Sequence, residues 1–141
     1  MVEKVFIANI EYLHEMLGFI KSFCIENGFD LNSMNKIALA TEEALVNIIH
    51  HGYKNKKGTI EIICEKCTPQ PGVKIVLKDK GVPFNPIEQV QKIKKNHKTP
   101  LEDSSIGGYG IFLYVEIMDE VEYKRIDDMN FLFLIKYLKN G

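Results

Sequence analysis

The chain has 141 residues, a length that predicts one domain, over 1–141, with its own buried core. It is 45% hydrophobic and 26% charged with a net charge of −1, so nothing in its composition attracts it to nucleic acid or to an anionic membrane. Three cysteines make a poor disulfide framework, and no signal-peptide core or long apolar run is present. We therefore expect a cytoplasmic protein that does not span a membrane.

The first elements along the chain are a strand and a helix. Residues 2–8 are rich in β-forming residues and predict a strand. Apolar residues then recur at helical spacing over 10–27, with Asn9 as the candidate N-cap and Gly28 as the stop signal.

A second helix is predicted over 33–51, capped by Asp30 or Asn32. Its apolar stripe consists of Met34, Ile37, Thr41, Ala44, Leu45, Ile48 and Gly52. At about 100° per residue, Glu43, Asn47 and His50 share the opposite side. The residues that flank this polar group are Leu39, Ala40 and Val46. A few polar groups among apolar neighbours indicate a partly covered, pocket-lining face, although a plain solvated face is the alternative.

The rest of the chain predicts strands and one short helix. Residues 59–66 and 73–79 alternate like a hairpin, and an apolar stretch after GGYG predicts the short helix. DEVEYKR and MNFLFLIKYL predict two closing strands joined at Asp127–Asp128. This order indicates an α+β fold, a two-layer sandwich with helices on one face of a mainly antiparallel, mixed sheet.

Two loops carry further candidate site residues. In DKGVPFNP, Asp79 ends a strand and could accept a hydrogen bond from an exocyclic amine, and Gly81 permits a close approach. In IGGYGIFL, glycines lead into a helix N-terminus, where free N–H groups and the helix dipole suit phosphate. Each motif alone is also compatible with an ordinary turn or hinge.

The order of these motifs resembles the Bergerat ATP-binding fold of the GHKL superfamily. TEEALVNIIHHGY, DKGVPFNP and LEDSSIGGYGIFLYVEIMDEVEYKR are similar to the bacterial anti-sigma-factor serine/threonine kinases, its small single-domain branch. The resemblance covers nearly the whole chain. It implies a histidine-kinase-like ATPase domain that uses ATP and Mg²⁺.

The resemblance also implies roles for individual residues. Asn47 would bind Mg²⁺, and Glu43 would act as general base. Asp79 would bind the adenine amino group and Gly81 would let the base lie against the backbone. Gly107, Gly108, Tyr109 and Gly110 would wrap the phosphates. His50 and His51 would have a supporting role.

Residues 87–106 would form the ATP lid. We interpret most lysines of KIKKNHK, 92–98, as solvated. The more specific alternative is that one of them reaches the γ-phosphate. Some members of the kinase branch carry an Arg just before the lid glycines, whereas this chain has Ile106. A nucleotide-dependent binding regulator with weak or absent catalysis is therefore the alternative to a kinase.

The implied partners are a STAS-type anti-anti-sigma protein, which would be phosphorylated on a serine, and a sigma factor. The branch often forms dimers through the N-terminal strand and helix, which would bury part of Phe6 and Ile7.

A third hypothesis belongs to another class: Cys64 and Cys67 form a C-x-x-C, as in redox pairs and half zinc sites. No second C-x-x-C or spaced His pair completes a zinc set.

Overall fold

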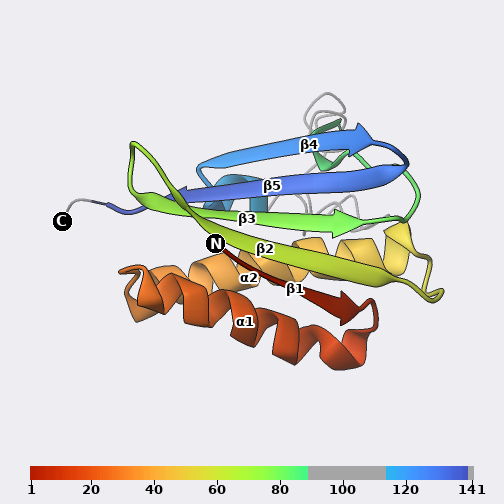
Figure 1. The fold of residues 1–141 in the computed structure, drawn as a ribbon, viewed down its shortest axis with the longest axis horizontal. Helices are drawn as coiled ribbons and strands as arrows, with labels where there is room; N and C mark the ends of the chain where they lie inside the picture. Colours follow the sequence, from red (N-terminus) through yellow and green to blue (C-terminus); the bar gives the residue numbers. More distant parts are fainter. Residues whose placement is uncertain (89–113, 140–141) are drawn as a thin grey trace, which may run out of the picture.

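Two helices cover one face of a five-stranded sheet in the computed structural model, which describes residues 1–88 and 114–139 (Figure 1). The elements are β1 (Val2–Ile7), η1 (Ile10–Tyr12), α1 (Leu13–Glu26), α2 (Leu31–Asn47), η2 (Ile48–Gly52), β2 (Thr59–Cys67), β3 (Gly72–Asp79), β4 (Glu120–Ile126) and β5 (Met129–Tyr137). The predicted two-layer α+β architecture is confirmed. Among the described helices, none combines the length and hydrophobicity needed to cross a membrane.

The sheet has the strand order β1-β2-β3-β5-β4. All four neighbouring pairs are antiparallel, so the prediction of a mixed sheet is wrong for the described strands. Two of the four pairs, β2–β3 and β4–β5, are hairpins, which can only be antiparallel. This order places the end of β3 beside the start of β5, where Asp79 pairs with Asn130.

Side-chain caps start both predicted helical segments. Asn9 Oδ1 accepts a hydrogen bond from the backbone N–H of Glu11 at 3.0 Å, at the start of η1. Of the two candidate caps for the second helix, Asp30 is the one used, because its Oδ1 accepts from Ser33 N at 2.7 Å. Each cap satisfies a backbone donor that has no partner within the helix.

The second helix does not run as α-helix to residue 51, as the sequence predicts. It ends at Asn47, and η2 continues as a π-helical turn in which Tyr53 N donates to Ile48 O at 2.9 Å. A π-helical turn widens the helix by one residue and is often found at functional sites. Here it directly follows Asn47.

The core lies between the helices and the sheet. Its fully buried aliphatic side chains include Met16, Ile20, Ile37, Leu45, Ile60, Ile62, Ile75, Leu77 and Leu134. Burying one such side chain contributes about 1.5–3 kcal/mol to folding. The predicted faces of α2 are wrong at Leu39. This residue is 43% exposed and does not help to cover the polar group of Glu43, Asn47 and His50.

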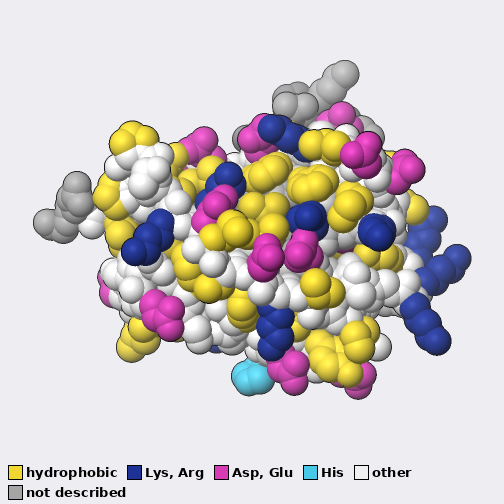
Figure 2. All heavy atoms as spheres, in the orientation of Figure 1, with side chains coloured by type: hydrophobic (Ala, Val, Ile, Leu, Met, Phe, Trp, Pro, Cys, Tyr) yellow, Lys and Arg dark blue, Asp and Glu magenta, His cyan; other side chains and the backbone are white. Residues whose placement is uncertain are grey.

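The opposite face of the sheet carries no helix among the described residues. Figure 2 shows it as a mixture of hydrophobic, basic and acidic side chains. Ion pairs link β2 and β3 across this face, Lys74–Glu65 at 3.1 Å and Lys78–Glu61 at 2.9 Å. The same lysines lie over phenylalanine rings of β5, so their stems cover part of the aromatic surface.

The hairpin that closes the chain has the predicted turn. Asp127 and Asp128 both adopt positive φ, 52° and 61°, as a two-residue turn of this hairpin class requires. The turn sets the register in which Asn130 lies opposite Arg125 on β4.

Candidate functional site

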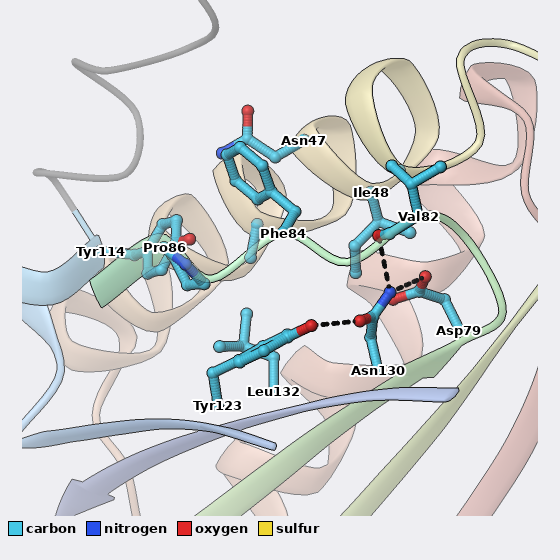
Figure 3. A pocket seen from close by; sticks show the side chains of 12 residues that line it. Asn47, Ile48, Asp79, Val82, Phe84, Pro86, Tyr114, Tyr123, Asn130 and Leu132 are labelled. Carbon is cyan, nitrogen blue, oxygen red and sulfur yellow. Dashed lines mark hydrogen bonds between the residues drawn. The ribbon is translucent and has the colours of Figure 1, made fainter. Parts of the chain in front are cut away.

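A pocket opens beside the C-terminal end of α2, between that helix and the strands β3, β4 and β5 (Figure 3). Its described lining consists of Ala44, Asn47, Ile48, Gly52, Asp79, Val82, Phe84, Pro86, Tyr114, Tyr123, Asn130 and Leu132. An apolar pocket with a few convergent polar groups is the usual form of a small-molecule site. The cavity volume is about 30 Å³, so a ligand as large as a purine needs side chains at the mouth to move.

Asp79 is only 4% exposed at the inner wall of this pocket. Its Oδ1 accepts hydrogen bonds from Gly81 N at 2.8 Å and from Asn130 Nδ2 at 2.9 Å. Among the described residues, Oδ2 receives no hydrogen bond. Burial raises the pKa of the carboxyl group, and the two hydrogen bonds act in the opposite direction. When ionised, Asp79 therefore has one carboxylate oxygen available to a donor on a ligand.

Position 81 requires a glycine because the backbone of another part of the chain lies very close to it. A β carbon at this position would stand 2.6 Å from the carbonyl carbon of Gly52 and 2.7 Å from its oxygen. The backbone of Val82 also donates to Gly52 O at 2.9 Å. The turn after β3 is thus held against the end of η2. This contact fixes the position of Asp79, the last residue of β3. The backbone that approaches Gly81 closely is that of Gly52.

Asn47 is 6% exposed and lines the same pocket. Its Nδ2 atom is buried and has no hydrogen-bond partner within residues 1–88 and 114–139. An unpaired buried amide costs folding free energy, of the order of 1–3 kcal/mol. An amide in this state, facing a pocket, is ready to bind a polar ligand.

Asn47 fits a role as Mg²⁺ ligand. Mg²⁺ is held by one or two protein oxygens together with phosphate and water, and a half-turn of the amide presents its oxygen instead of its nitrogen. The described residues contain no cluster of three or more His, Cys, Asp or Glu side chains that could hold a metal ion by itself. A cation here would therefore depend on phosphate oxygens for most of its ligands.

Glu43 lies one helical turn before Asn47 and is half-buried, but it is not among the described residues that line the pocket. Burial raises the pKa of its carboxyl group, and the charge of Glu42 raises it further. Burial also raises the pKa of Tyr114, whereas the nearby side chain of Asn47 lowers it and the charge of Glu43 raises it by a smaller amount. Glu43 therefore lies near the pocket wall that Tyr114 forms.

The two histidines have different surroundings. His50 is exposed, and its Nδ1 lies 2.7 Å from Asn55 Oδ1. The ring of His51 stacks on that of Phe84 with 6.3 Å between centroids, and burial lowers the pKa of His51. His51 thus contacts a pocket residue, Phe84.

Some site residues were missed by the sequence analysis. They are Tyr114, Tyr123, Arg125 and Asn130, and the last three come from the closing hairpin. The available signal was Asn130, which shares an inward-facing register with Leu132 and Leu134 on a strand whose other residues are apolar as far as Ile135. A polar residue at a core position of a strand needs partners, and here the partners are in the pocket.

Most of the predicted lid, together with Ile106, Gly107, Gly108, Tyr109 and Gly110, lies outside the described residues. The C-x-x-C is described. Cys64 is fully buried among the core residues, whereas Cys67, three positions on, lies on the opposite face of the sheet. Two thiols on opposite faces of a sheet cannot share a disulfide or a metal ion.

The fold and pocket agree with a known family. A family model described as histidine kinase-like ATPase domain matches residues 6–136, and the chain belongs to this family. This confirms the resemblance to the GHKL ATPases.

The similarity extends to proteins named serine-protein kinase RsbW. The Bacillus mycoides protein is 28% identical over 113 residues, which cover 79% of this chain and 69% of the relative. The Oceanobacillus iheyensis protein is 31% identical over 104 residues, covering 67% and 60%. The Staphylococcus epidermidis protein is 26% identical over 140 residues, covering 94% and 83%.

Proposed function

We propose that the protein is a Mg-ATP-dependent serine/threonine kinase that acts as an anti-sigma factor in a partner switch. One observation carries the proposal: the unpaired amide of Asn47 and the available carboxylate oxygen of Asp79 line one apolar pocket. An acceptor for a base and a polar group for a phosphate-bound cation are what an ATP site requires. The relatives named serine-protein kinase support the choice of reaction.

Each residue has a distinct role in this proposal. Asp79 Oδ2 accepts a hydrogen bond from the adenine amino group, and Gly81 holds the turn that positions Asp79. Asn47 binds Mg²⁺, which supplies neutralising charge at the phosphates when bound. Gly107, Gly108, Tyr109 and Gly110 contact the phosphates.

Glu43 acts as general base on the substrate serine. The serine oxygen forms a bond to the γ-phosphorus, the bond between that phosphorus and the bridging β–γ oxygen breaks, and ADP leaves. The hydroxyl proton passes to the Glu43 carboxylate. A half-buried carboxylate with a raised pKa is a better proton acceptor than one in water.

The substrate we propose is a serine of a STAS-type anti-anti-sigma protein, and the second partner is a sigma factor. The direct test is transfer of labelled γ-phosphate to such a protein, with Glu43→Ala as the inactive variant and Glu26→Ala as a matched control. Glu26 is an exposed carboxylate at the end of α1, far along the chain from the pocket residues. Transfer should require Glu43 and should be indifferent to Glu26.

The same experiment separates the alternative function. If calorimetry detects Mg-ATP binding while wild type and Glu43→Ala show equal, background transfer, the protein is a nucleotide-dependent binding regulator. Transfer by the wild type alone supports the kinase.

We also propose that the chain forms a homodimer through its N-terminal strand. Phe6 is buried in the core against Phe19, whereas Val5 and Ile7 are 56% and 54% exposed on β1, an edge strand. The exposed pair, and not Phe6, is therefore the part available to a second copy. Analytical sedimentation of the wild type and of a Val5→Lys/Ile7→Lys double variant tests this proposal. We expect a dimer for the wild type and a monomer for the variant.

A further inference from the structure

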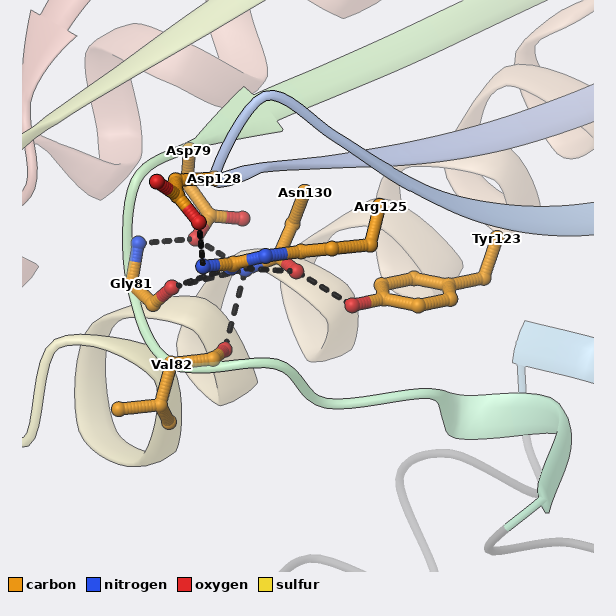
Figure 4. Close-up of polar contacts among 7 residues, drawn as sticks. All are labelled: Asp79, Gly81, Val82, Tyr123, Arg125, Asp128 and Asn130. Atoms are coloured by element: carbon orange, nitrogen blue, oxygen red, sulfur yellow. Dashed lines mark hydrogen bonds and ion pairs between the residues drawn. The ribbon is translucent and has the colours of Figure 1, made fainter.

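A hydrogen-bonded network connects Asp79 to the closing hairpin (Figure 4). At its centre is Asn130, which is 5% exposed. The Nδ2 of Asn130 donates to Asp79 Oδ1 at 2.9 Å and to the carbonyl oxygens of Val82 at 3.0 Å and Gly81 at 3.2 Å. One amide nitrogen thus holds both the carboxylate and the turn that follows it.

The orientation of the Asn130 amide is determined from the other side. Its Oδ1 accepts hydrogen bonds from the Tyr123 hydroxyl and from Arg125 Nη1, the latter at 3.1 Å. A guanidinium group can only donate. Turning the amide over would place its NH₂ against these donors and its oxygen against the Asp79 carboxylate. Arg125 therefore forces Asn130 to present its donors to Asp79.

This arrangement keeps Asp79 a hydrogen-bond acceptor. Donors from Asn130 and Gly81 occupy Oδ1, so a proton on the carboxyl group could reside only on Oδ2, the oxygen that faces a ligand. Burial raises the pKa of Asp79, whereas the hydrogen bonds from Asn130 and Gly81 and the charge of Arg125 lower it. Burial thus favours protonation of Oδ2, and the network opposes it.

Arg125 does not itself line the pocket. Its Nη1 also donates to Gly81 O at 2.7 Å, and its Nη2 lies 3.9 Å from Asp128 Oδ1 in the hairpin turn. It therefore acts on the ligand site through Asn130, through the turn after β3 and through its charge on Asp79.

We propose that Arg125 is a positioning residue for base recognition: through Asn130 it holds Asp79 as an acceptor, and so sets a preference for a purine with a 6-amino group over one with a 6-oxo group. The inference rests on the nucleotide site proposed above. A carboxylate oxygen pairs with the amino group of adenine and repels the carbonyl oxygen of guanine. A protonated Oδ2 would do the reverse.

The test compares Arg125→Met with Lys124→Met. Both changes remove one positive charge from β4, but Lys124 is exposed on the opposite face, where it lies 3.5 Å from Glu122. Competition binding of ATP and GTP should show that Arg125→Met lowers the ATP-to-GTP affinity ratio about tenfold, the value of one well-made hydrogen bond to a charged group. Lys124→Met should leave the ratio unchanged.

A second readout is the pH dependence of ATP binding. Without Arg125, the pKa of Asp79 should be higher. As pH is lowered, Asp79 should therefore become protonated, and ATP affinity should decline, at a higher pH than in the wild type. Arg125→Gln keeps a donor but loses the charge, and should shift both readouts in the same direction by less. A role limited to stability would change neither the ratio nor the pH at which affinity declines.

The outcomes separate this inference from the proposed function. If the wild type binds ATP and both Arg125 variants keep its base preference and pH profile, the positioning role is refuted while the nucleotide site stands. If the wild type binds neither nucleotide, the proposed function fails and the base preference fails with it. In the nucleotide-free protein, the Asn130 side-chain amide protons should exchange with water faster in Arg125→Met than in Lys124→Met, and equal exchange would contradict the network.

Discussion

Gly81 lies so close to Gly52 that the two backbones leave no room for a β carbon between them; a β carbon on Gly81 would stand 2.6 Å from the Gly52 carbonyl carbon. The obstacle is backbone and not the end of a flexible side chain, so it cannot easily give way. This contact joins the turn after β3 to the end of η2 and thereby sets the place of Asp79.

Gly81→Ala should therefore destabilise the fold by about 1–3 kcal/mol, as overpacking does. The matched change is Gly18→Ala in α1, where a β carbon would meet nothing within 4 Å. That variant should be more stable by about 0.5–1 kcal/mol, because alanine is the better helix residue. Urea denaturation measures both, and equal stabilities for the two variants would contradict the close approach.

Asn47→Ala should fold normally and lose Mg-ATP binding. Its buried Nδ2 has no partner in the described residues, so removing the amide ends a desolvation cost and offsets the lost packing. Calorimetry with Mg-ATP and a denaturation curve give the two quantities. Asn35→Ala, on the exposed side of the same helix, is the control and should bind as the wild type does. Tight binding by Asn47→Ala would exclude Asn47 as a ligand.

Asp79→Asn should move base preference from ATP toward GTP. The amide oxygen can replace Oδ1 toward Gly81 and Asn130, which leaves an NH₂ group in place of Oδ2. That donor repels an amino group and pairs with a carbonyl oxygen. Competition between the two nucleotides measures the change, with the exposed Asp127→Asn as control; an unchanged preference would remove Asp79 from base recognition.

The same substitution should alter the pH dependence of stability. The folded-state pKa of Asp79 is raised by burial, so between the ordinary Asp pKa and the raised value the folded state binds more protons than the unfolded state. Stability contributed by this group therefore falls as pH rises through that window. Asp79→Asn should remove this decline in denaturation curves taken at several pH values.

The rate of phosphate transfer should rise with pH as Glu43 loses its proton, with a midpoint above the ordinary Glu range. Burial and the charge of Glu42 both raise the pKa of Glu43. Glu42→Gln removes the second cause, so its pH–rate curve should shift to lower pH while the plateau rate is kept. A curve that stays in place would mean that Glu43 is not the titrating base.

The thiols should differ in reactivity. Burial raises the pKa of Cys24 and of Cys64 to about 12, and both are buried, whereas Cys67 is half-buried at the end of β2. A thiol reagent should label the folded protein at Cys67 alone, and slowly, because the pKa of Cys67 is raised as well. Cys67→Ser should abolish labelling of the folded protein, and labelling that persists would place another thiol at the surface.

Local signals in the sequence were sufficient for most of the fold. Asp30 and Asn9 cap helices as predicted, and Asp127–Asp128 forms the predicted turn, because caps and turns depend on residues a few positions apart. The faces of α2 were less well predicted. Leu39 is exposed and the helix changes to a π-helical turn after Asn47, since both depend on what packs against the helix.

The sequence by itself determined the elements, the two-layer architecture and the candidate residues of α2 and of the turn after β3, because periodicity and short motifs are local. Only the tertiary structure decided which groups meet. It brought Asn130 and Arg125, about fifty residues further along the chain, to Asp79, because antiparallel pairing sets the register of β5 on β3. It also identified Gly52 as the neighbour that Gly81 accommodates, since a close approach between distant backbones leaves no local trace in the sequence.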